Sequence, residues 1–154
     1  MKLYLTQHGE AHSKEQDPNR PLTSKGVDDV ERIALFLKQA GVQVKRIIHS
    51  GKLRAKQTAE QLAKQFASDI ELETTGIINP NDSPETFAWQ SGSWEDDTLI
   101  VGHLPFLARL VSHLINGEEE PVMVAFQPGS VVCLERVKDE QWVINWMIRP
   151  GLLG

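Results

Sequence analysis

This sequence of 154 residues has a single cysteine, no excess of positive charge and no long apolar run. The single cysteine, Cys133, excludes an internal disulfide and the cysteine-rich zinc and iron–sulfur patterns. No run of roughly 18 apolar residues is present and no signal-peptide pattern begins the chain, so we expect no membrane span and a soluble, cytoplasmic protein. The formal net charge of −5 at pH 7 argues against a general nucleic-acid-binding protein.

Length and composition predict one domain over residues 1–154. Hydrophobic residues make up 40% of the chain, enough for a full-sized core, and no repeat or low-complexity linker marks a boundary. The apolar run from Leu3 to Leu5 predicts a short first strand, central in a parallel sheet because it has no polar alternate face. Further extended runs cover 44–48, 70–74, 98–101, 122–126, 130–137 and 142–148, the last two forming an antiparallel hairpin.

Four stretches have the apolar period or the end signals of helices. Thr23 is expected to cap the first helix and Gly41 to stop it, while Ser50 is expected to cap the second. A short third helix lies within the long loop that follows Ile77. The four helices are predicted over 24–40, 51–66, 84–90 and 105–116.

Two histidines follow strands at the edge where α/β folds bind ligands. His8 comes directly after the first strand and precedes Gly9, which lets the backbone turn sharply and approach a ligand closely. His103 follows the strand 98–101 and Gly102, and it precedes a helix. Ligands of open α/β sheets bind outside the carboxyl ends of the strands. A lone histidine there is usually an ordinary polar residue, but two in the same arrangement favour a functional site.

Two arginines are expected on the same side of the fold. Arg54 lies in the first turn of the second helix, where a cation is unfavourable unless an anion is bound, and Arg20 directly precedes the first helix. The alternative for both is that their side chains point to water. Guanidinium has no lone pair for a metal ion, but its N–H groups match phosphate oxygens. Two histidines with two arginines therefore favour a phosphoryl group as the ligand.

Four motifs in this order resemble the histidine phosphatase superfamily, whose fold is that of the phosphoglycerate mutases. They are Gln7-His8-Gly9 after a strand, Arg20-Pro21-Leu22-Thr23, Ser50 with Leu53-Arg54-Ala55, and Gly102-His103-Leu104-Pro105. The short chain resembles the small, SixA-like branch of phosphohistidine phosphatases. The resemblance implies an α/β three-layer sandwich, with a mainly parallel central sheet and helices on both faces, and no metal or organic cofactor.

The resemblance also implies roles for individual residues. His8 matches the nucleophile, Arg54 and His103 match further catalytic residues, and Arg20 matches a substrate-binding arginine. The implied substrate is a phosphorylated protein that carries a phosphohistidine domain, or a small phosphorylated molecule. Neither nucleic acid nor membrane is expected as a partner.

Gln7 departs from the pattern of the superfamily, which normally has arginine before the nucleophilic histidine. Glutamine keeps an N–H donor but loses the charge and the bidentate fork. Loss of one transition-state donor costs on the order of 10²–10³ in rate, so the sequence predicts a slow phosphatase with Gln7 as a weakened substrate-binding residue. Lys25 and Lys52 are candidates to replace the missing charge.

The loop after Ile78 offers no clear proton donor for the leaving group. Its carboxylates, Asp82 and Glu85, are more simply explained as solvated loop side chains. A phosphatase without such an acid is suited to a substrate with an easy leaving group, such as phosphohistidine. The expected mechanism is attack of neutral His8 on phosphorus, followed by hydrolysis of the phosphorylated histidine.

Two alternatives remain at this point. Loss of the first arginine also fits a catalytically impaired module that binds phosphate or a phosphoprotein. His8-Gly9-Glu10-Ala11-His12 suggests a metal hydrolase, but it is not the zincin His-Glu-x-x-His spacing, and Gly9 disfavours the helix that such a site needs. We therefore expect no metal site.

Overall fold

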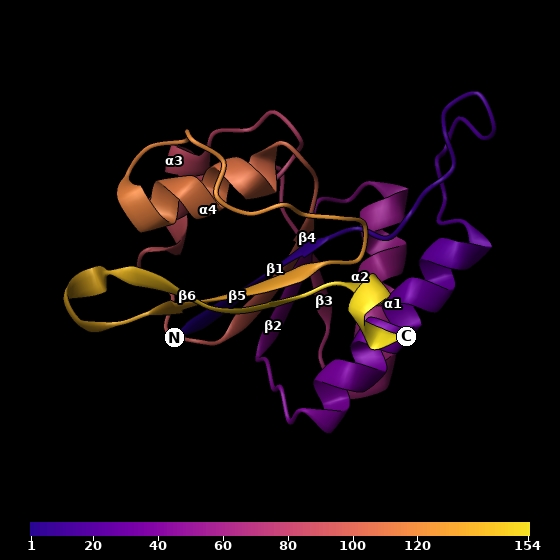
Figure 1. Cartoon of the computed structure of the whole chain (residues 1–154), viewed down its shortest axis with the longest axis horizontal. Coiled ribbons are helices and arrows are strands. Elements are labelled where there is room, and N and C mark those ends of the chain that lie inside the picture. The colour runs from indigo at the N-terminus through magenta and orange to yellow at the C-terminus, as the bar shows by residue number, and fades with distance from the viewer.

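A computed structural model of the chain describes residues 1–154, in which six strands form one sheet in the order β3-β2-β4-β1-β5-β6 (Figure 1). The strands are β1 (Lys2–Gln7), β2 (Arg46–His49), β3 (Leu72–Thr74), β4 (Thr98–Gly102), β5 (Val131–Arg136) and β6 (Trp142–Ile148). The helices are α1 (Ser24–Gln39), α2 (Leu53–Phe66), α3 (Pro84–Ser91) and α4 (Phe106–Asn116), with short 3-10 turns η1 (Lys138–Glu140) and η2 (Pro150–Leu153).

The sheet is mainly parallel, as predicted. The strands β1 to β4 pair in parallel, whereas β5 runs antiparallel to β1 and β6 antiparallel to β5. The first strand lies between β4 and β5, in the interior of the sheet. Its residues Leu3 to Gln7 are all buried, which agrees with a strand that has no solvent-facing side.

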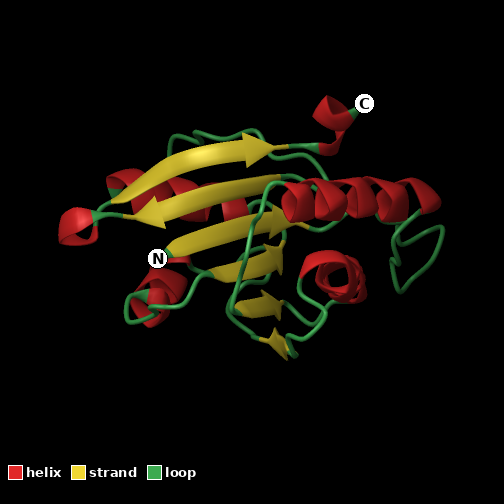
Figure 2. Ribbon diagram, turned by 90° about the horizontal axis from the view of Figure 1, so that it is seen from below, coloured by secondary structure: helices red, strands yellow, loops and turns green.

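Helices cover both faces of the sheet and complete the predicted three layers (Figures 1 and 2). Leu3 and Leu5 of β1 point to the face covered by α3 and α4, where they join one apolar cluster. Tyr4, with the opposite orientation, joins a second cluster with α1 and α2. The alternation of side chains along a strand thus divides the core into two halves. No helix combines the length and the apolar character needed to cross a membrane.

Two of the helices begin after a capping side chain, and one of these caps, Thr23, was predicted. Thr23 caps α1, since its Oγ1 accepts a hydrogen bond from the N–H of Gly26 at 2.9 Å. Ser83 caps α3 in the same way through the N–H of Thr86. The turn of the predicted hairpin is also found, at η1 between β5 and β6.

Two strand predictions need correction. The second strand begins at Arg46 and extends through His49, two residues later at its start than the run 44–48 suggested. The run 122–126 forms no strand. Val124 and Phe126 instead pack their side chains into the cluster on the α4 face, so the apolar character of this segment reflects packing against the sheet and not strand pairing.

Candidate active site

The two predicted histidines meet at the carboxyl ends of neighbouring strands. His8 follows β1 and His103 follows β4, and the last residues of these strands, Gln7 and Gly102, are direct partners in the parallel ladder. The N–H of His8 donates to the carbonyl of Gly102 at 3.1 Å. The two imidazole rings consequently lie 5.0 Å apart between centroids.

A cavity of about 470 Å³ opens at this point. It is lined by Gln7, His8, Glu10, Ala11, Arg20, Arg54, Pro80, His103, Leu104 and Pro128. All five residues singled out from the sequence are in this set. The structure therefore brings together side chains that lie far apart in the chain, from Gln7 to His103.

The ring of His8 is held in one orientation by its own backbone. Its Nδ1 lies 2.7 Å from the carbonyl oxygen of Gly9. Because a carbonyl only accepts, Nδ1 carries the proton in the neutral ring, and Nε2 keeps its lone pair. Burial, together with the charges of Arg54 and Arg20, lowers the pKa of His8 to about 4, against the opposing effect of the Gly9 carbonyl. His8 is therefore neutral at pH 7.

The backbone after His8 is fixed by Thr58. The N–H of Gly9 donates to Oγ1 of Thr58 at 3.0 Å, and this hydroxyl donates to the carbonyl of Arg54 at 2.8 Å. A Cβ on Gly9 would lie 2.8 Å from Cγ2 of Val30, closer than side chains pack. A glycine is thus required for the loop to pass α1, and Thr58 ties that loop to the start of α2.

His103 is almost fully buried, with 1% of its surface exposed. Its Nε2 lies 2.7 Å from Oγ of Ser50, while its Nδ1 has no hydrogen-bond partner. Burial, together with the neighbouring His8 and Arg54, lowers the pKa of His103 to about 3. The ring is neutral at pH 7 like that of His8.

Ser50 was expected to cap α2, and this is wrong. Lys52 occupies the N-cap position of α2 and makes no side-chain cap bond. The hydroxyl of Ser50 contacts His103 instead. Since Ser50 directly follows β2, the strand-end rule that identified the histidines could have marked it as a site residue.

The two arginines share the cavity, and their charges affect each other. Burial and the charge of Arg20 lower the pKa of Arg54, whose Nε is buried without a partner. Arg20 has a left-handed backbone with φ of 49°, and its Nε donates to the carbonyl of His12 at 2.9 Å. Arg20 lines the cavity together with His8 and Arg54. Two cations beside a single carboxylate, that of Glu10, leave excess positive charge, which favours an anionic ligand.

Gln7 lies in the wall of the cavity with 8% of its surface exposed, and its Oε1 is buried without a partner. No lysine lines the cavity beside it. Lys25, one candidate for the missing charge, pairs with Asp29 at 2.8 Å and is largely exposed. Lys52 stands at the start of α2, close enough for its charge to lower the pKa of His103.

Glu10 is the carboxylate that lines the cavity, and sequence reasoning missed it. Its Oε2 accepts a hydrogen bond from Oγ1 of Thr23 at 2.7 Å. Neither Asp82 nor Glu85 lines the cavity, and Asp82 accepts from the N–H of Asn79 within its own turn. No group of three or more His, Cys, Asp or Glu side chains is placed to hold a metal ion, including His8, Glu10 and His12.

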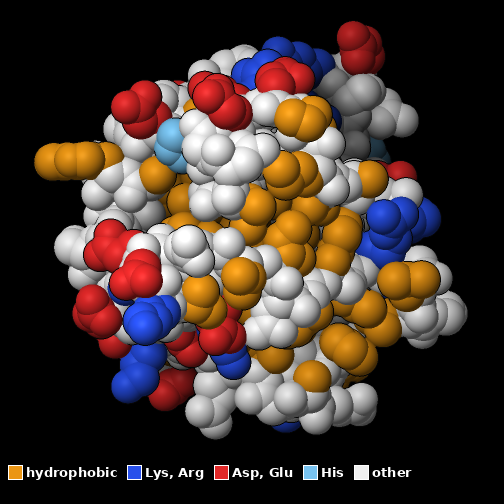
Figure 3. Space-filling model, turned by 60° about the vertical axis from the view of Figure 1, so that its left-hand side comes forward, with side chains coloured by type: hydrophobic (Ala, Val, Ile, Leu, Met, Phe, Trp, Pro, Cys, Tyr) orange, Lys and Arg blue, Asp and Glu red, His pale blue; other side chains and the backbone are white.

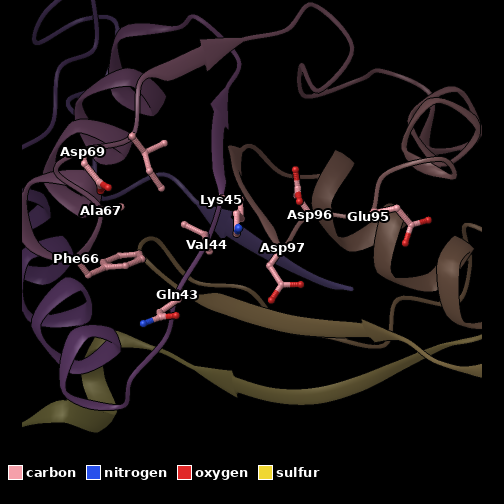
Figure 4. Close-up of a pocket in the computed structure, with 10 residues that line it drawn as sticks. Gln43, Val44, Lys45, Phe66, Ala67, Asp69, Glu95, Asp96 and Asp97 are labelled. Carbon is pink, nitrogen blue, oxygen red and sulfur yellow. The ribbon is translucent and has the colours of Figure 1, made fainter.

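A larger hollow of about 720 Å³ lies at the opposite edge of the sheet (Figure 4). Its walls come from the segments before β2 and β4, and from the end of α2. Asp69, Glu95, Asp96 and Asp97 line it, with Lys45 as the one cation. An acidic hollow at the amino ends of the strands is unsuited to phosphate, so the smaller cavity is the candidate active site.

Known proteins share both the sequence and this geometry. The family description "Histidine phosphatase superfamily (branch 1)" matches residues 3–75. Phosphohistidine phosphatase SixA of Escherichia coli K12 is 26% identical over 155 residues, which cover 97% of this chain and 94% of SixA. An uncharacterized protein of Picosynechococcus sp. PCC 7002 is 33% identical over 125 residues, covering 77% of this chain and 75% of that protein.

Solved structures agree with the sequence relatives. The structure of the protein histidine phosphatase SixA complexed with tungstate has a TM-score of 0.85, is 25% identical, and is matched over 100% of both chains. The likeness thus covers the whole sheet, the helices on both faces and the edge that carries His8 and His103. The chain belongs to the histidine phosphatase superfamily, within its SixA-like branch, and is a phosphatase.

Proposed function

We propose that this chain removes phosphoryl groups from phosphohistidine on a protein, through a phosphorylated His8. The observation that carries the proposal is the bond between Nδ1 of His8 and the Gly9 carbonyl. It leaves the lone pair of Nε2 available in a cavity that also contains Arg20, Arg54 and His103. The relative named phosphohistidine phosphatase SixA supports the choice of substrate.

The chemistry takes place in two displacements. In the first, Nε2 of His8 attacks phosphorus, an N–P bond forms, and the bond from phosphorus to the substrate nitrogen breaks; the substrate imidazole leaves neutral because its other ring nitrogen carries a proton. In the second, water attacks phosphorus, the bond to His8 breaks, and phosphate leaves with neutral His8 restored. A neutral histidine is required at the start, which the lowered pKa of His8 supports.

The arginines and His103 hold the transferring group. Its equatorial oxygens carry the charge of the transition state, and preorganised N–H donors stabilise that charge. Nε of Arg54 and Nδ1 of His103 are buried and have no partner within the chain. Buried polar atoms are normally paired, so unpaired ones are expected where a ligand supplies the partner.

A nitrogen leaving group is proposed because no carboxylate is free in the cavity to protonate an oxygen leaving group. Asp82 and Glu85 lie outside the cavity, and Glu10 is engaged by the hydroxyl of Thr23. The P–N bond of phosphohistidine breaks more easily than the P–O bond of an alkyl phosphate, so it makes less demand on a proton donor. A phosphohistidine protein is accordingly favoured over a small alkyl phosphate.

The test compares the natural chain with His8→Ala. Phosphate release from a phosphohistidine-carrying protein domain should fall to background in His8→Ala. His113→Ala, on α4 and outside the cavity, serves as the matched control and should keep the activity. Full activity in His8→Ala would contradict the proposed nucleophile, and release from a phosphorylated metabolite alone would contradict the protein substrate.

A second candidate is a catalytically impaired member that binds a phosphorylated partner. Gln7 favours it, because the cavity lacks one charge at the nucleophile. In that case the natural chain turns over no faster than His8→Ala but still binds phosphate, and Arg54→Ala abolishes the binding.

A further inference from the structure

The strand β6 is an open edge that carries neither charge nor proline, and a bulge is the one protective feature within it. It pairs with β5 alone, and no backbone hydrogen bond outside the helices and strand ladders involves one of its residues. Its seven residues, Trp142–Ile148, include no charge and no proline. Exposed edge strands normally carry lysine, proline or a covering segment, because an unprotected edge pairs with other chains.

The middle of β6, residues 143–145, is exposed, whereas Trp142, Trp146, Met147 and Ile148 pack partly against the core. Six of its seven residues are apolar, yet none of the seven is buried. Val143 and Ile144 are 44% and 42% exposed. Figure 3 shows a face of the molecule on which hydrophobic side chains gather in a broad area, with acidic and basic side chains around it. Apolar areas of this kind mark sites of protein association.

We propose that β6 pairs antiparallel with β6 of a second copy of this chain, so that two six-stranded sheets become one continuous sheet. A strand that pairs with itself across a two-fold axis gives an isologous, closed dimer. This proposal concerns an edge of the sheet apart from the cavity of His8, and it does not depend on the reaction there.

The bulge at Asn145 sets the register. Cys133 pairs with Trp146 and Leu134 with Ile144, so Asn145 is the extra residue on β6. Its amide donates to the Glu135 carboxylate at 3.0 Å. We place the two-fold axis at Asn145. Residues 142–144 of each copy then pair with residues 146–148 of the other copy. Ile144 then lies opposite Trp146 of the second copy, and apolar cross-strand pairs of this kind stabilise a sheet.

Charge at the two ends of β6 favours a second copy in this orientation. The strand is preceded by Asp139 and Glu140 and followed by Arg149. Neither Glu140 nor Arg149 takes part in an ion pair within the chain. Antiparallel pairing centred on Asn145 places Arg149 of each copy opposite Gln141 of the other, next to Glu140 in the acidic turn. A single copy therefore supplies both the apolar strand and the complementary charges.

Sedimentation velocity across a wide range of protein concentration tests the proposal. The natural chain should sediment as a dimer, and Ile144→Lys should sediment as a monomer because a charge enters the paired edge. Leu35→Lys on α1 is the matched control, since Leu35 is 40% exposed but lies away from β6, and it should remain a dimer. A natural chain that stays monomeric up to millimolar concentration overturns the proposal, as does a dimer that survives Ile144→Lys.

A charge exchange tests the orientation. Arg149→Glu and Glu140→Arg should each weaken the dimer, because each places like charges together at both ends. A mixture of the two variants should associate again, since the carboxylate introduced at the end of β6 in one variant then meets the guanidinium introduced before β6 in the other. Failure of the mixture to associate while both single variants are weakened contradicts the antiparallel register. Circular dichroism on every variant establishes that the fold is retained.

Discussion

Oγ of Ser50 lies 2.7 Å from Nε2 of His103, and this contact joins the ends of β2 and β4 beneath the nucleophile. His103 is otherwise enclosed, with 1% of its surface exposed. The hydroxyl therefore fixes the ring that faces His8 at 5.0 Å between centroids. We therefore propose Ser50 as a positioning residue that acts through His103.

Replacing Ser50 by alanine should lower kcat/KM about fivefold, since a neutral hydrogen bond contributes about 1 kcal/mol. Ser112→Ala provides a matched control, because the buried Ser112 hydroxyl on α4, outside the cavity, donates to the carbonyl of Pro121 at 2.8 Å. Both variants should lose some stability, but only Ser50→Ala should lose activity. Equal activity in the two variants would remove Ser50 from the site.

Gly26→Ala should destabilise the protein by about 1–3 kcal/mol, the usual cost of forcing extra atoms into a packed site. A Cβ at Gly26 would overlap the carbonyl of Glu10, and the loop after His8 would have to move. Gly76→Ala meets no atom within 4 Å and should be nearly neutral. Urea unfolding of both variants measures the difference. A stable Gly26→Ala variant would show that the loop yields easily.

Gln7→Arg should raise the phosphatase rate by on the order of 10²-fold, because it restores a charged donor beside His8. Gln39→Arg, at the exposed end of α1, adds the same charge away from the cavity and should leave the rate unchanged. Initial rates of phosphate release under matched conditions give the comparison. A Gln7→Arg variant no faster than the natural chain would mean that the missing arginine does not limit turnover.

Stability should fall as the pH is lowered from 7 toward 4. In the unfolded chain a histidine takes up a proton near its ordinary pKa of about 6.5, whereas burial holds the pKa of His8 at about 4 and that of His103 at about 3. Between these values the unfolded state binds more protons, so acid favours unfolding. Full stability is present above pH 6.5.

Thermal unfolding measured from pH 7 to pH 4.5 checks this expectation. His103→Asn removes one buried neutral histidine and should make Tm less dependent on pH. His113→Asn on α4, outside the cavity, is the control. An unchanged pH dependence in His103→Asn would mean that His103 has the same pKa in the folded and the unfolded chain.

Much of this fold could be predicted from local signals. The strand at Leu3 to Leu5, the Thr23 cap and the turn between β5 and β6 each depend on a few neighbouring residues, and each was found where expected. The run 122–126 was mistaken for a strand because its apolar residues serve packing on the sheet face. Local sequence does not distinguish packing from pairing.

The residues of the candidate site were likewise predicted only in part. Gln7, His8, Arg20, Arg54 and His103 line one cavity because strand ends and helix starts share one edge of the sheet. Glu10 and Ser50 were missed as site residues, since their roles depend on contacts with Thr23 and His103 that only the folded chain creates. From the sequence alone, Glu10 could equally be a solvated loop residue, and Ser50 could equally be a helix cap.

The central claim is that Nε2 of His8 becomes phosphorylated during turnover. The direct measurement is to mix the protein with a phosphohistidine domain, quench within the first turnover at alkaline pH, and locate the phosphoryl group by mass spectrometry. The account predicts an acid-labile phosphoryl group on His8, absent from His8→Ala and longer-lived in Ser50→Ala. Phosphate release with no label on His8 at any time would contradict it.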